Sequence, residues 1–438
     1  MEKKKQKTKY LIVLGDGMAD HADANGQTPL SLAKKPFIDE LCFKSELALV
    51  QTVPIGMAPG SDTANLSVMG YDPKVYYTGR SPLEAASIGV KLNNGDVTFR
   101  MNLVSLREEA GGTVPPLQET PVGAGLPDRP QEYENLIMHD YSAGEIETAE
   151  AKKLVEILKP YAPEGFELFA GTSYRHCMVF RQCTMSDKNS NNNSKLSSSN
   201  SQLNKDNNCA LNLTPPHDIT DKPITHHLPP EPFLSFIKKS YEVLKNHPDN
   251  KTKANSAWIW GMGTKPLLTD FSKKFGVKGA VISEVDLIKG IGLSANMTSI
   301  DVDGADGSLH TNYEGMVEAT IKAFDTHDFV YLHIEAPDEM GHKGDKDGKI
   351  LSIEFLNDRV VKPLVESLTK NYHLKMLFLP DHATPLKLKT HTDEPVPYML
   401  YDSNSVSMKH SLPYTELGAK ESGVLVSKGH ELIVKLLK

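Results

Sequence analysis

The chain has 438 residues, 24% of them charged and 39% hydrophobic, and this length is enough for two or three domains with substantial cores. Its net charge of -8 at pH 7, without a basic stripe, argues against nucleic acid as a partner. Four cysteines that match no zinc-binding spacing favour a reducing compartment over a disulfide scaffold.

The first element predicted is a buried strand over residues 9–14, followed at once by Gly-Asp-Gly. This arrangement delivers the carboxylate of Asp16 to the carboxyl-terminal end of a strand, where α/β proteins bind ligands. The apolar run of residues 10–14 is too short for a signal peptide or a membrane span. We therefore expect a cytoplasmic protein without a membrane partner.

The next segments alternate between helix and strand. An amphipathic stretch begins at Thr28 and runs to about Phe43, a strand is predicted over residues 47–53, and Pro-Gly-Ser then opens a further helical pattern. Ser61 has two interpretations at this helix start: a simple N-cap, or a hydroxyl placed where the helix amides stabilise an anion. The two roles are compatible.

The pattern changes after residue 92. A strand over residues 96–106, a Gly- and Pro-rich loop over 111–130, a helix over 148–158 and a strand over 174–184 indicate a second domain. We predict an inserted substrate domain at 93–265, between the first part (1–92) and the second part (266–438) of a metal-binding domain. The Asn-, Ser- and Lys-rich tract at 186–208 predicts a disordered loop, with a binding loop as the less favoured alternative.

Alternation resumes beyond the middle segment, with strands expected at residues 279–283, 329–335, 376–379 and 397–401 and a closing helix at 430–437. Asp338 and His342 follow one of these strands at a four-residue spacing, so a helical turn would place them on one face. Asp381 and His382 follow another strand, and His391 lies in the next loop. Each of these side chains, taken alone, has an ordinary alternative as a solvated surface group.

Carboxylates, imidazoles and one hydroxyl are thus expected at neighbouring strand ends. Two divalent ions a few ångströms apart need oxygen and imidazole ligands of this kind, together with a hydroxyl that a metal helps to ionise. The combination indicates a two-metal phosphoryl-transfer centre with Ser61 as the hydroxyl.

The chain resembles the cofactor-independent (2,3-bisphosphoglycerate-independent) phosphoglycerate mutases, archaeal-type branch, of the alkaline phosphatase superfamily. The resemblance spans nearly the whole chain and rests on segments 14–20, 60–73, 77–86, 174–176, 216–219, 258–261, 282–290, 336–339 and 380–382. It implies an α/β fold with an alkaline-phosphatase-like sheet, helices on both faces, and a smaller inserted α/β domain.

The resemblance also implies roles. Ser61 would be the nucleophile that becomes phosphoserine while 3-phosphoglycerate and 2-phosphoglycerate interconvert in glycolysis or gluconeogenesis, without bisphosphoglycerate. One ion would be held by Asp16, Ser61, Asp381 and His382, and the other by Asp338, His342 and His391. Manganese is the first choice, with magnesium, cobalt and zinc as alternatives.

The substrate side is less specific. A small-molecule substrate is expected to contact candidates in the middle domain, where a guanidinium could fork onto the glycerate carboxylate and Asp140 or His217 could move protons. The candidates are Asp140, Arg175, His176, His217 and Asp218, with Asn65 and Lys289 near the phosphoryl group. Each could instead be a surface charge.

Two rival functions share these features. A metal-dependent phosphatase, or another phosphotransferase acting for example on homoserine, would use the same ions and Ser61, and only the middle domain separates it from a mutase. A non-catalytic metal-binding or scaffold protein would be expected to have lost a ligand or the nucleophile, and none is lost. The oligomeric state is left open by the sequence.

Overall fold

The computed structural model describes residues 6–108, 133–181, 211, 213–405 and 407–438. The predicted loop at 186–208 and the Gly- and Pro-rich loop at 111–130 lie outside these residues. The chain divides into two compact units, one made of Met1–Tyr77 with Pro266–Lys438 and the other of Thr78–Lys265. The sequence analysis placed the first boundary after residue 92, whereas residues 78–92 group here with the second unit.

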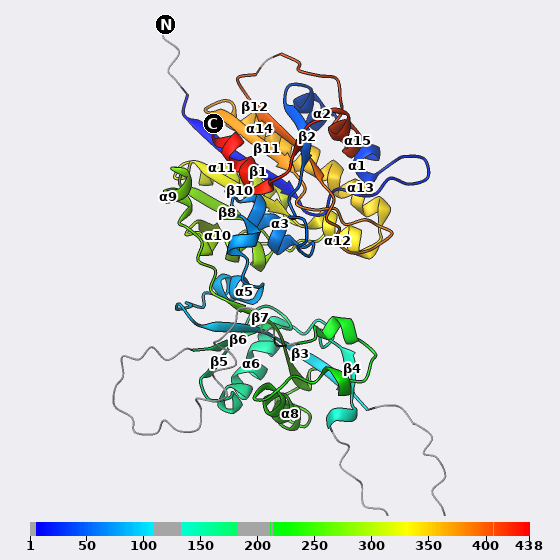
Figure 1. The fold of residues 1–438 in the computed structure, drawn as a ribbon, viewed down its shortest axis with the longest axis vertical. Helices are drawn as coiled ribbons and strands as arrows, with labels where there is room; N and C mark the ends of the chain where they lie inside the picture. Colours follow the sequence, from blue (N-terminus) through cyan, green and yellow to red (C-terminus); the bar gives the residue numbers. More distant parts are fainter. Residues whose placement is uncertain (1–5, 109–132, 182–210, 212, 406) are drawn as a thin grey trace, which may run out of the picture. The chain divides into compact units, whose positions relative to one another are not determined.

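The first unit is built on an eight-stranded sheet (Figure 1). Its order is β13 (Leu425–Val426), β2 (Glu46–Val50), β12 (Val396–Asp402), β11 (His373–Leu379), β1 (Thr8–Gly15), β10 (Phe329–Ile334), β8 (Gly279–Ile282) and β9 (Thr298–Ile300). Strand β12 is antiparallel to both of its neighbours, and the other pairs are parallel. Because β11, β1 and β10 are adjacent and parallel, their carboxyl ends lie at one edge of the sheet.

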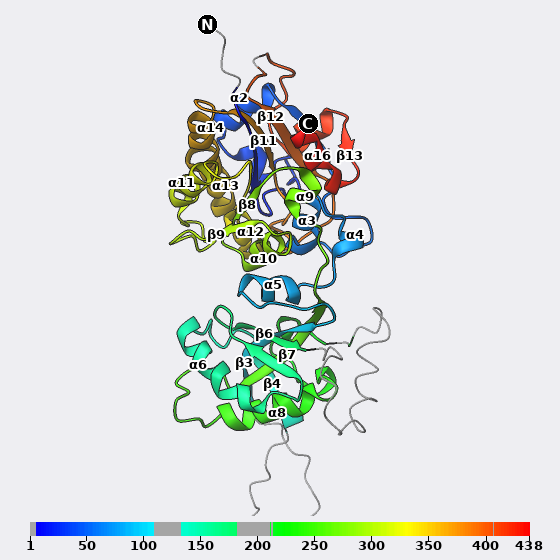
Figure 2. The same ribbon diagram turned by 90° about the vertical axis from the view of Figure 1, so that its left-hand side faces the viewer.

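Helices cover both faces of this sheet, as Figure 2 shows from the side. One face carries α1 (Pro29–Leu32), α2 (Pro36–Phe43), α11 (Tyr313–Ala323), α13 (Lys346–Phe355), the π-helical turn η5 (Leu356–Val361) and α14 (Lys362–Leu368). The other face carries α3 (Ser61–Val68), α9 (Phe271–Phe275), α10 (Asp286–Ser294) and α16 (Leu432–Leu437). The side chains of β1 alternate accordingly: Leu11 and Val13 join the first core, and all of Leu11 to Leu14 is fully buried.

The remaining elements of this unit are short. They are α4 (Pro73–Tyr76), α12 (Ala336–Lys343), α15 (Glu416–Glu421) and the 3-10 turn η6 (Gly429–Glu431). The amphipathic stretch predicted from Thr28 to about Phe43 forms two helices instead of one. Pro36 begins α2, and the residue before a proline is kept out of helical geometry, so the helix breaks at Lys35, whose ψ is 55°.

The second unit has a five-stranded antiparallel sheet. The long strand β3 (Val97–Arg107) pairs with β4 (Ile137–Asp140), β6 (Arg175–Phe180) and β7 (Ser256–Thr264), and β6 also pairs with β5 (Phe166–Phe169). Its helices are α5 (Ser81–Ser87), α6 (Thr148–Leu158) and α8 (Phe233–Leu244), with the 3-10 turns η1 (Tyr133–Asn135), η2 (Lys159–Tyr161), η3 (Pro216–Ile219) and η4 (Thr225–His227).

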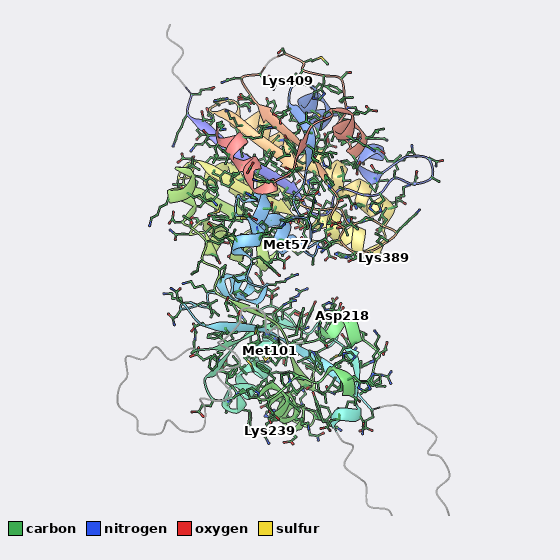
Figure 3. All side chains as sticks on the ribbon, viewed as in Figure 1. Met57, Met101, Asp218, Lys239, Lys389 and Lys409 are labelled. Carbon is green, nitrogen blue, oxygen red and sulfur yellow. The ribbon has the colours of Figure 1, made fainter. Side chains whose placement is uncertain are left out.

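The two faces of β3 and β6 pack against different helices. Met101, labelled in Figure 3, and Phe99 join a core with residues of α6 and α8, whereas Cys177 and Val179 pack against Ala85 of α5. The predicted fold class, an α/β sheet with helices on both faces and a smaller α/β domain inserted in it, is confirmed. No described helix is both long enough and apolar enough to cross a membrane.

Candidate active site

Three strands of the first unit end beside one another and deliver acidic side chains to the same place. Leu14 of β1 is opposite Leu379 of β11, and Gly15 is opposite Ile334 of β10. Asp16 therefore lies beside the segments that begin after β10 and β11, which carry Asp338 and Asp381. Close approach depends on Gly17, whose φ is +56° and where an added Cβ would lie 2.4 Å from the Asp338 Oδ1 atom.

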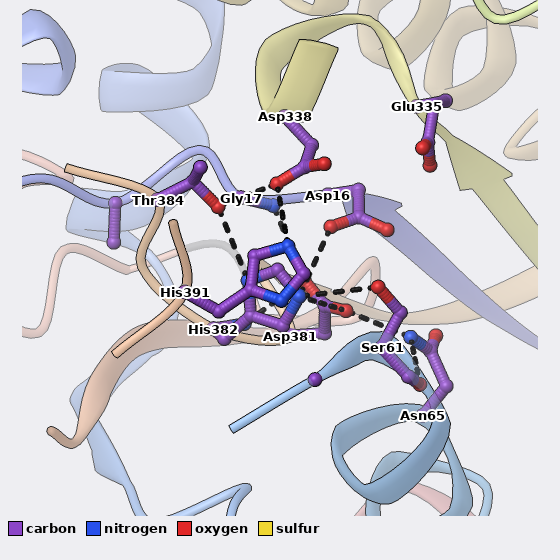
Figure 4. A network of polar contacts seen from close by, with 12 residues as sticks. Asp16, Gly17, Ser61, Asn65, Glu335, Asp338, Asp381, His382, Thr384 and His391 are labelled. Atoms are coloured by element: carbon purple, nitrogen blue, oxygen red, sulfur yellow. Dashed lines mark hydrogen bonds and ion pairs between the residues drawn. The ribbon is translucent and has the colours of Figure 1, made fainter. Parts of the chain in front are cut away.

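Ser61 opens α3 and is turned toward this edge. The N-cap of α3 is Gly60, and Ser61 is the first residue of the helix, with no side-chain capping bond. The alternative of a capping serine is therefore wrong. The Ser61 hydroxyl instead lies 3.2 Å from the Nε2 atom of His382, a contact drawn in Figure 4.

The inner group consists of Asp16, Asp381 and His382. The Nε2 atom of His382 lies 3.5 Å from the Asp16 Oδ1 atom and 3.3 Å from the Asp381 Oδ2 atom. None of the three side chains is more than 1% exposed. Their ligand atoms all lie within 4.8 Å of one another, which is close enough for one metal ion to bind all three.

The outer group consists of Asp338, His342 and His391. The Nε2 atom of His342 lies 3.1 Å from Asp338 Oδ2 and 2.9 Å from His391 Nε2, and His391 Nε2 lies 3.5 Å from Asp338 Oδ1. His342 is 38% exposed and His391 is 21% exposed. Asp338 and His391 also lie within 4.8 Å of His382, and the rings of His382 and His391 stack with centroids 4.0 Å apart.

The electrostatics of the two groups differ. Burial raises the pKa of Asp16 well above its ordinary value, and the carboxylates of Asp381, Glu335 and Asp338 raise it further. Burial would also raise the pKa of Asp338, but hydrogen bonds with His342 and His391 outweigh it and hold this pKa well below its usual range. Asp338 in turn raises the pKa of His342 to about 9.

These donors fit divalent cations. The Asp16 Oδ1 atom is buried and has no hydrogen-bond partner among the described residues. The ion pairs that the three carboxylates make within this part of the chain are with histidines. An unpartnered buried carboxylate oxygen beside other carboxylates is costly without a compensating positive charge. Carboxylate and imidazole ligands together suit manganese, zinc, cobalt or magnesium.

Several supporting side chains were missed by the sequence analysis. His333, in the middle of β10, is completely buried between Asp16 Oδ2, 2.8 Å from its Nε2 atom, and Ser283 Oγ, 3.1 Å from its Nδ1 atom. Burial lowers the pKa of His333 to about 4, so its ring is neutral, and its Nε2 atom shares a hydrogen bond with Asp16. With Glu335, it forms a third set of potential ligand atoms around Asp16. The segment His-Ile-Glu was present in the sequence but carried no spacing that indicates a site.

Asn65 has a different place from the one expected. Its amide nitrogen donates to the Ser61 carbonyl oxygen and to the Asp381 Oδ2 atom, and its Oδ1 atom accepts from the Tyr331 hydroxyl. Both amide hydrogens are therefore used inside the protein, and Asn65 is completely buried. It fixes Asp381 in position and has no donor left for a phosphoryl group. Lys289, also expected near that group, is paired with Asp301 at 2.7 Å.

Two of the substrate candidates in the second unit also have structural partners. The carboxylate of Asp140 accepts hydrogen bonds from Ser142 and from the Gly144 amide, which outweigh burial and hold its pKa below its ordinary value. These hydrogen bonds fix the carboxylate within a turn, and its role in moving protons stays a prediction. His176 is 5% exposed and its Nδ1 atom accepts from the Gly171 amide, so its ring lies in the interior of the unit.

The other candidates of this unit are accessible. His217 contacts the rings of Tyr141 and Trp260, and its neighbour Asp218, labelled in Figure 3, is more than half exposed. Burial lowers the pKa of His217, and its charged neighbours include Arg100 and Arg80. Arg175 is exposed and lies over the ring of Tyr174.

A cationic cluster around Glu84 was also missed. Arg80 and Arg100 both donate to the Glu84 carboxylate, and the Arg100 guanidinium stacks on Trp260 at 3.9 Å. Arg175 is close enough to lower the pKa of Glu84 as well. Three guanidinium groups therefore lie around the carboxylate of Glu84. The Thr-Gly-Arg-Ser segment at 78–81 could have indicated Arg80 from the sequence. No sequence pattern marked Arg100, which lies within β3.

Comparison with known proteins gives one family. A family profile described as "2,3-bisphosphoglycerate-independent phosphoglycerate mutase" matches residues 43–250. A protein from Geobacter sulfurreducens named "Probable 2,3-bisphosphoglycerate-independent phosphoglycerate mutase" is 41% identical over 98% of this chain and 99% of its own length. A protein from Methanothrix thermoacetophila named "2,3-bisphosphoglycerate-independent phosphoglycerate mutase" is 38% identical over 98% of this chain and 99% of its own length.

Solved structures share the fold at lower identity. A protein from Pyrococcus horikoshii superposes with a TM-score of 0.71 at 22% identity, covering 99% of this chain and 98% of its own. A structure titled cofactor-independent phosphoglycerate mutase, from Thermoplasma acidophilum, has a TM-score of 0.59 at 20% identity. The match covers 98% of this chain and 100% of that structure's chain.

Proposed function

Because the chain belongs to the family of 2,3-bisphosphoglycerate-independent phosphoglycerate mutases, we propose that it interconverts 3-phosphoglycerate and 2-phosphoglycerate without bisphosphoglycerate. This isomerisation would serve glycolysis or gluconeogenesis. The observation that carries the proposal is the Ser61 hydroxyl, turned out of its capping role and toward His382 at the edge where three strands deliver carboxylates.

Ser61 is the proposed phosphoryl carrier. Its Oγ atom attacks phosphorus, an O–P bond to serine forms, and the bond between phosphorus and the glycerate C3 oxygen breaks. The second half reverses these events at the C2 oxygen and restores the free serine. The proton that leaves Ser61 takes the place of phosphorus on the glycerate C3 oxygen, and the proton that leaves the C2 hydroxyl in the second half restores the serine hydroxyl, so no net proton is consumed. The first-turn amides of α3 favour negative charge on the phosphoryl group.

The proposed metal centre uses seven residues. Asp16, Ser61, Asp381 and His382 would hold one divalent ion, and Asp338, His342 and His391 the other, with manganese as our first choice. The ions would neutralise the carboxylates and lower the cost of ionising the serine hydroxyl.

The second unit is the proposed holder of glycerate between the half-reactions. The substrate carboxylate requires a cationic partner, and the guanidinium groups around Glu84, among them the exposed Arg175, can supply one. We assign this role to Arg80, Arg100 and Arg175, with His217 and Asp218 nearby as polar contacts. Asp140 and His176 remain substrate-side candidates, although both have partners inside the unit. Retention of glycerate prevents loss of the phosphoryl group to water.

A direct test supplies the purified protein with Mn²⁺ and 3-phosphoglycerate, with no bisphosphoglycerate, and follows the phosphorus NMR spectrum. The proposal predicts growth of the 2-phosphoglycerate signal to equilibrium, little free phosphate, and loss of the reaction in Ser61→Ala. Free phosphate without the isomer would replace the mutase with a phosphatase. Absence of both products would direct the search to other acceptors, homoserine among them.

A further inference from the structure

The side chain of Thr384 lies between the inner and outer groups. Its Oγ1 atom is 2.5 Å from the Asp338 Oδ1 atom and 3.3 Å from the Nδ1 atom of His382. Thr384 is fully buried and is drawn with both partners in Figure 4. One atom of Thr384 thus contacts both groups. Among the described residues, no other side-chain atom outside the two groups forms hydrogen bonds with a member of each.

The backbone around Thr384 is fixed on several sides. Its amide donates to the Ala19 carbonyl oxygen, and its own carbonyl oxygen accepts from the Lys349 ammonium at 2.8 Å. Its methyl group packs on Gly341 of α12, where an added Cβ would lie 2.8 Å from the Thr384 Cγ2 atom. The hydroxyl is therefore held in place by its surroundings rather than by its two polar partners alone.

The hydrogen positions follow from the number of donors. A hydroxyl has one hydrogen and can accept through its lone pairs, and an ionised carboxylate can only accept. The Thr384 hydrogen therefore goes to Asp338, and the remaining contact requires His382 to donate its Nδ1 hydrogen to Thr384. A neutral imidazole with hydrogen on Nδ1 has a lone pair on Nε2. That lone pair is directed at Ser61, Asp16 and Asp381.

We propose that Thr384 is a positioning residue of the reaction centre. Its hydroxyl keeps His382 in the form that presents the Nε2 lone pair to the site, and it also donates to Asp338, so that one side chain supports a proposed ligand of each ion. The inference rests on the proposed two-metal function. Ligating histidines are generally oriented by an acceptor at the other ring nitrogen, and here one hydroxyl serves that role while also donating to a ligand of the other ion.

The test compares four full-length proteins freed of metal: the wild type, Thr384→Val, Thr384→Ser and Thr320→Val. Valine keeps the shape of threonine and removes the hydroxyl, and serine keeps the hydroxyl. Thr320 is a matched control because it is equally buried and bonds the Met316 carbonyl oxygen inside α11. Mn²⁺ binding is measured by calorimetry and electron paramagnetic resonance, and the tautomer of His382 by nitrogen NMR in the zinc-loaded proteins.

We expect Thr384→Val to weaken binding of both ions by about 10–100-fold, the usual effect of losing such a supporting group. Thr384→Ser should stay close to the wild type, Thr320→Val should bind both ions normally, and His382 should carry its hydrogen on Nδ1 in the wild type. Unchanged affinities in Thr384→Val, or a loss confined to one ion, would overturn the inference while leaving the proposed function intact. Failure of the wild type to bind two ions would instead overturn the metal centre and the inference with it.

Discussion

The inner and outer groups have similar ligands but different surroundings. Asp16, Asp381 and His382 are buried, and His333, Asn65, Thr384 and the Gly17 amide hold them. In the outer group, His342 and His391 are partly exposed, and the Nδ1 atom of His342 contacts only a backbone oxygen, that of Lys389, labelled in Figure 3. The comparison teaches that the proposed inner position is formed by buried side chains with several partners, whereas the proposed outer position includes two partly exposed imidazoles.

The largest expected difference is between the two ligand substitutions His382→Ala and His342→Ala. Loss of a supporting residue typically lowers metal affinity by about 10–100-fold, and loss of a direct ligand should lower it further. His382→Ala should therefore lower Mn²⁺ affinity at its position by more than about 100-fold and abolish turnover. His342→Ala should lower Mn²⁺ affinity at the outer position by about tenfold, because a water molecule can replace a partly exposed imidazole as ligand. Metal titration and turnover measurements check both. Equal losses would remove the distinction between the groups.

The supporting residue of the inner group gives the next largest effect. His333→Leu removes the hydrogen bond to Asp16 Oδ2 and should weaken the inner position by about 10–100-fold without changing the outer one. His333→Gln, which can still donate, should recover part of the loss. Binding of the two ions is followed separately by electron paramagnetic resonance. A loss at both positions would contradict the local role of His333.

Substrate binding should respond independently of the metal positions. Arg175→Met removes an exposed cation of the cluster around Glu84 and should raise the KM for 3-phosphoglycerate about tenfold, the scale of one charge-assisted hydrogen bond, with Mn²⁺ affinity unchanged. Lys239→Met removes an exposed cation of the same unit that pairs with Glu242, and it should leave both quantities unchanged. Steady-state kinetics at saturating Mn²⁺ distinguish the two.

The smallest effect concerns the order of metal release. With a slow chelator, the outer ion should leave first and the inner ion later, because burial of Asp16 and Asp381 limits access of water and chelator to the inner position. A two-phase loss of Mn²⁺ signal is expected in the wild type. His333→Leu should accelerate only the slow phase. A single phase in the wild type would mean that the two positions exchange together.

The sequence indicated the candidate ligands that follow strands, but not the side chains that form hydrogen bonds with them. Asp16, Asp338 and Asp381 were predictable because an apolar run that ends in a carboxylate has a defined place at a parallel sheet edge. His333 and Thr384 were not, since their importance depends on hydrogen bonds to residues distant in the chain. The turn that binds the Asp140 carboxylate was not predictable either, because its hydrogen bonds form only once the chain is folded.

The central claim is that Ser61 carries the phosphoryl group. The most direct measurement is to mix the Mn²⁺-loaded protein with 3-phosphoglycerate, quench in acid within a turnover, and locate the modification by peptide mass spectrometry. The account predicts phosphoserine at position 61 in the wild type and no phosphorylated peptide in Ser61→Ala. A phosphoryl group on another residue, or full mutase turnover by Ser61→Ala, would contradict it.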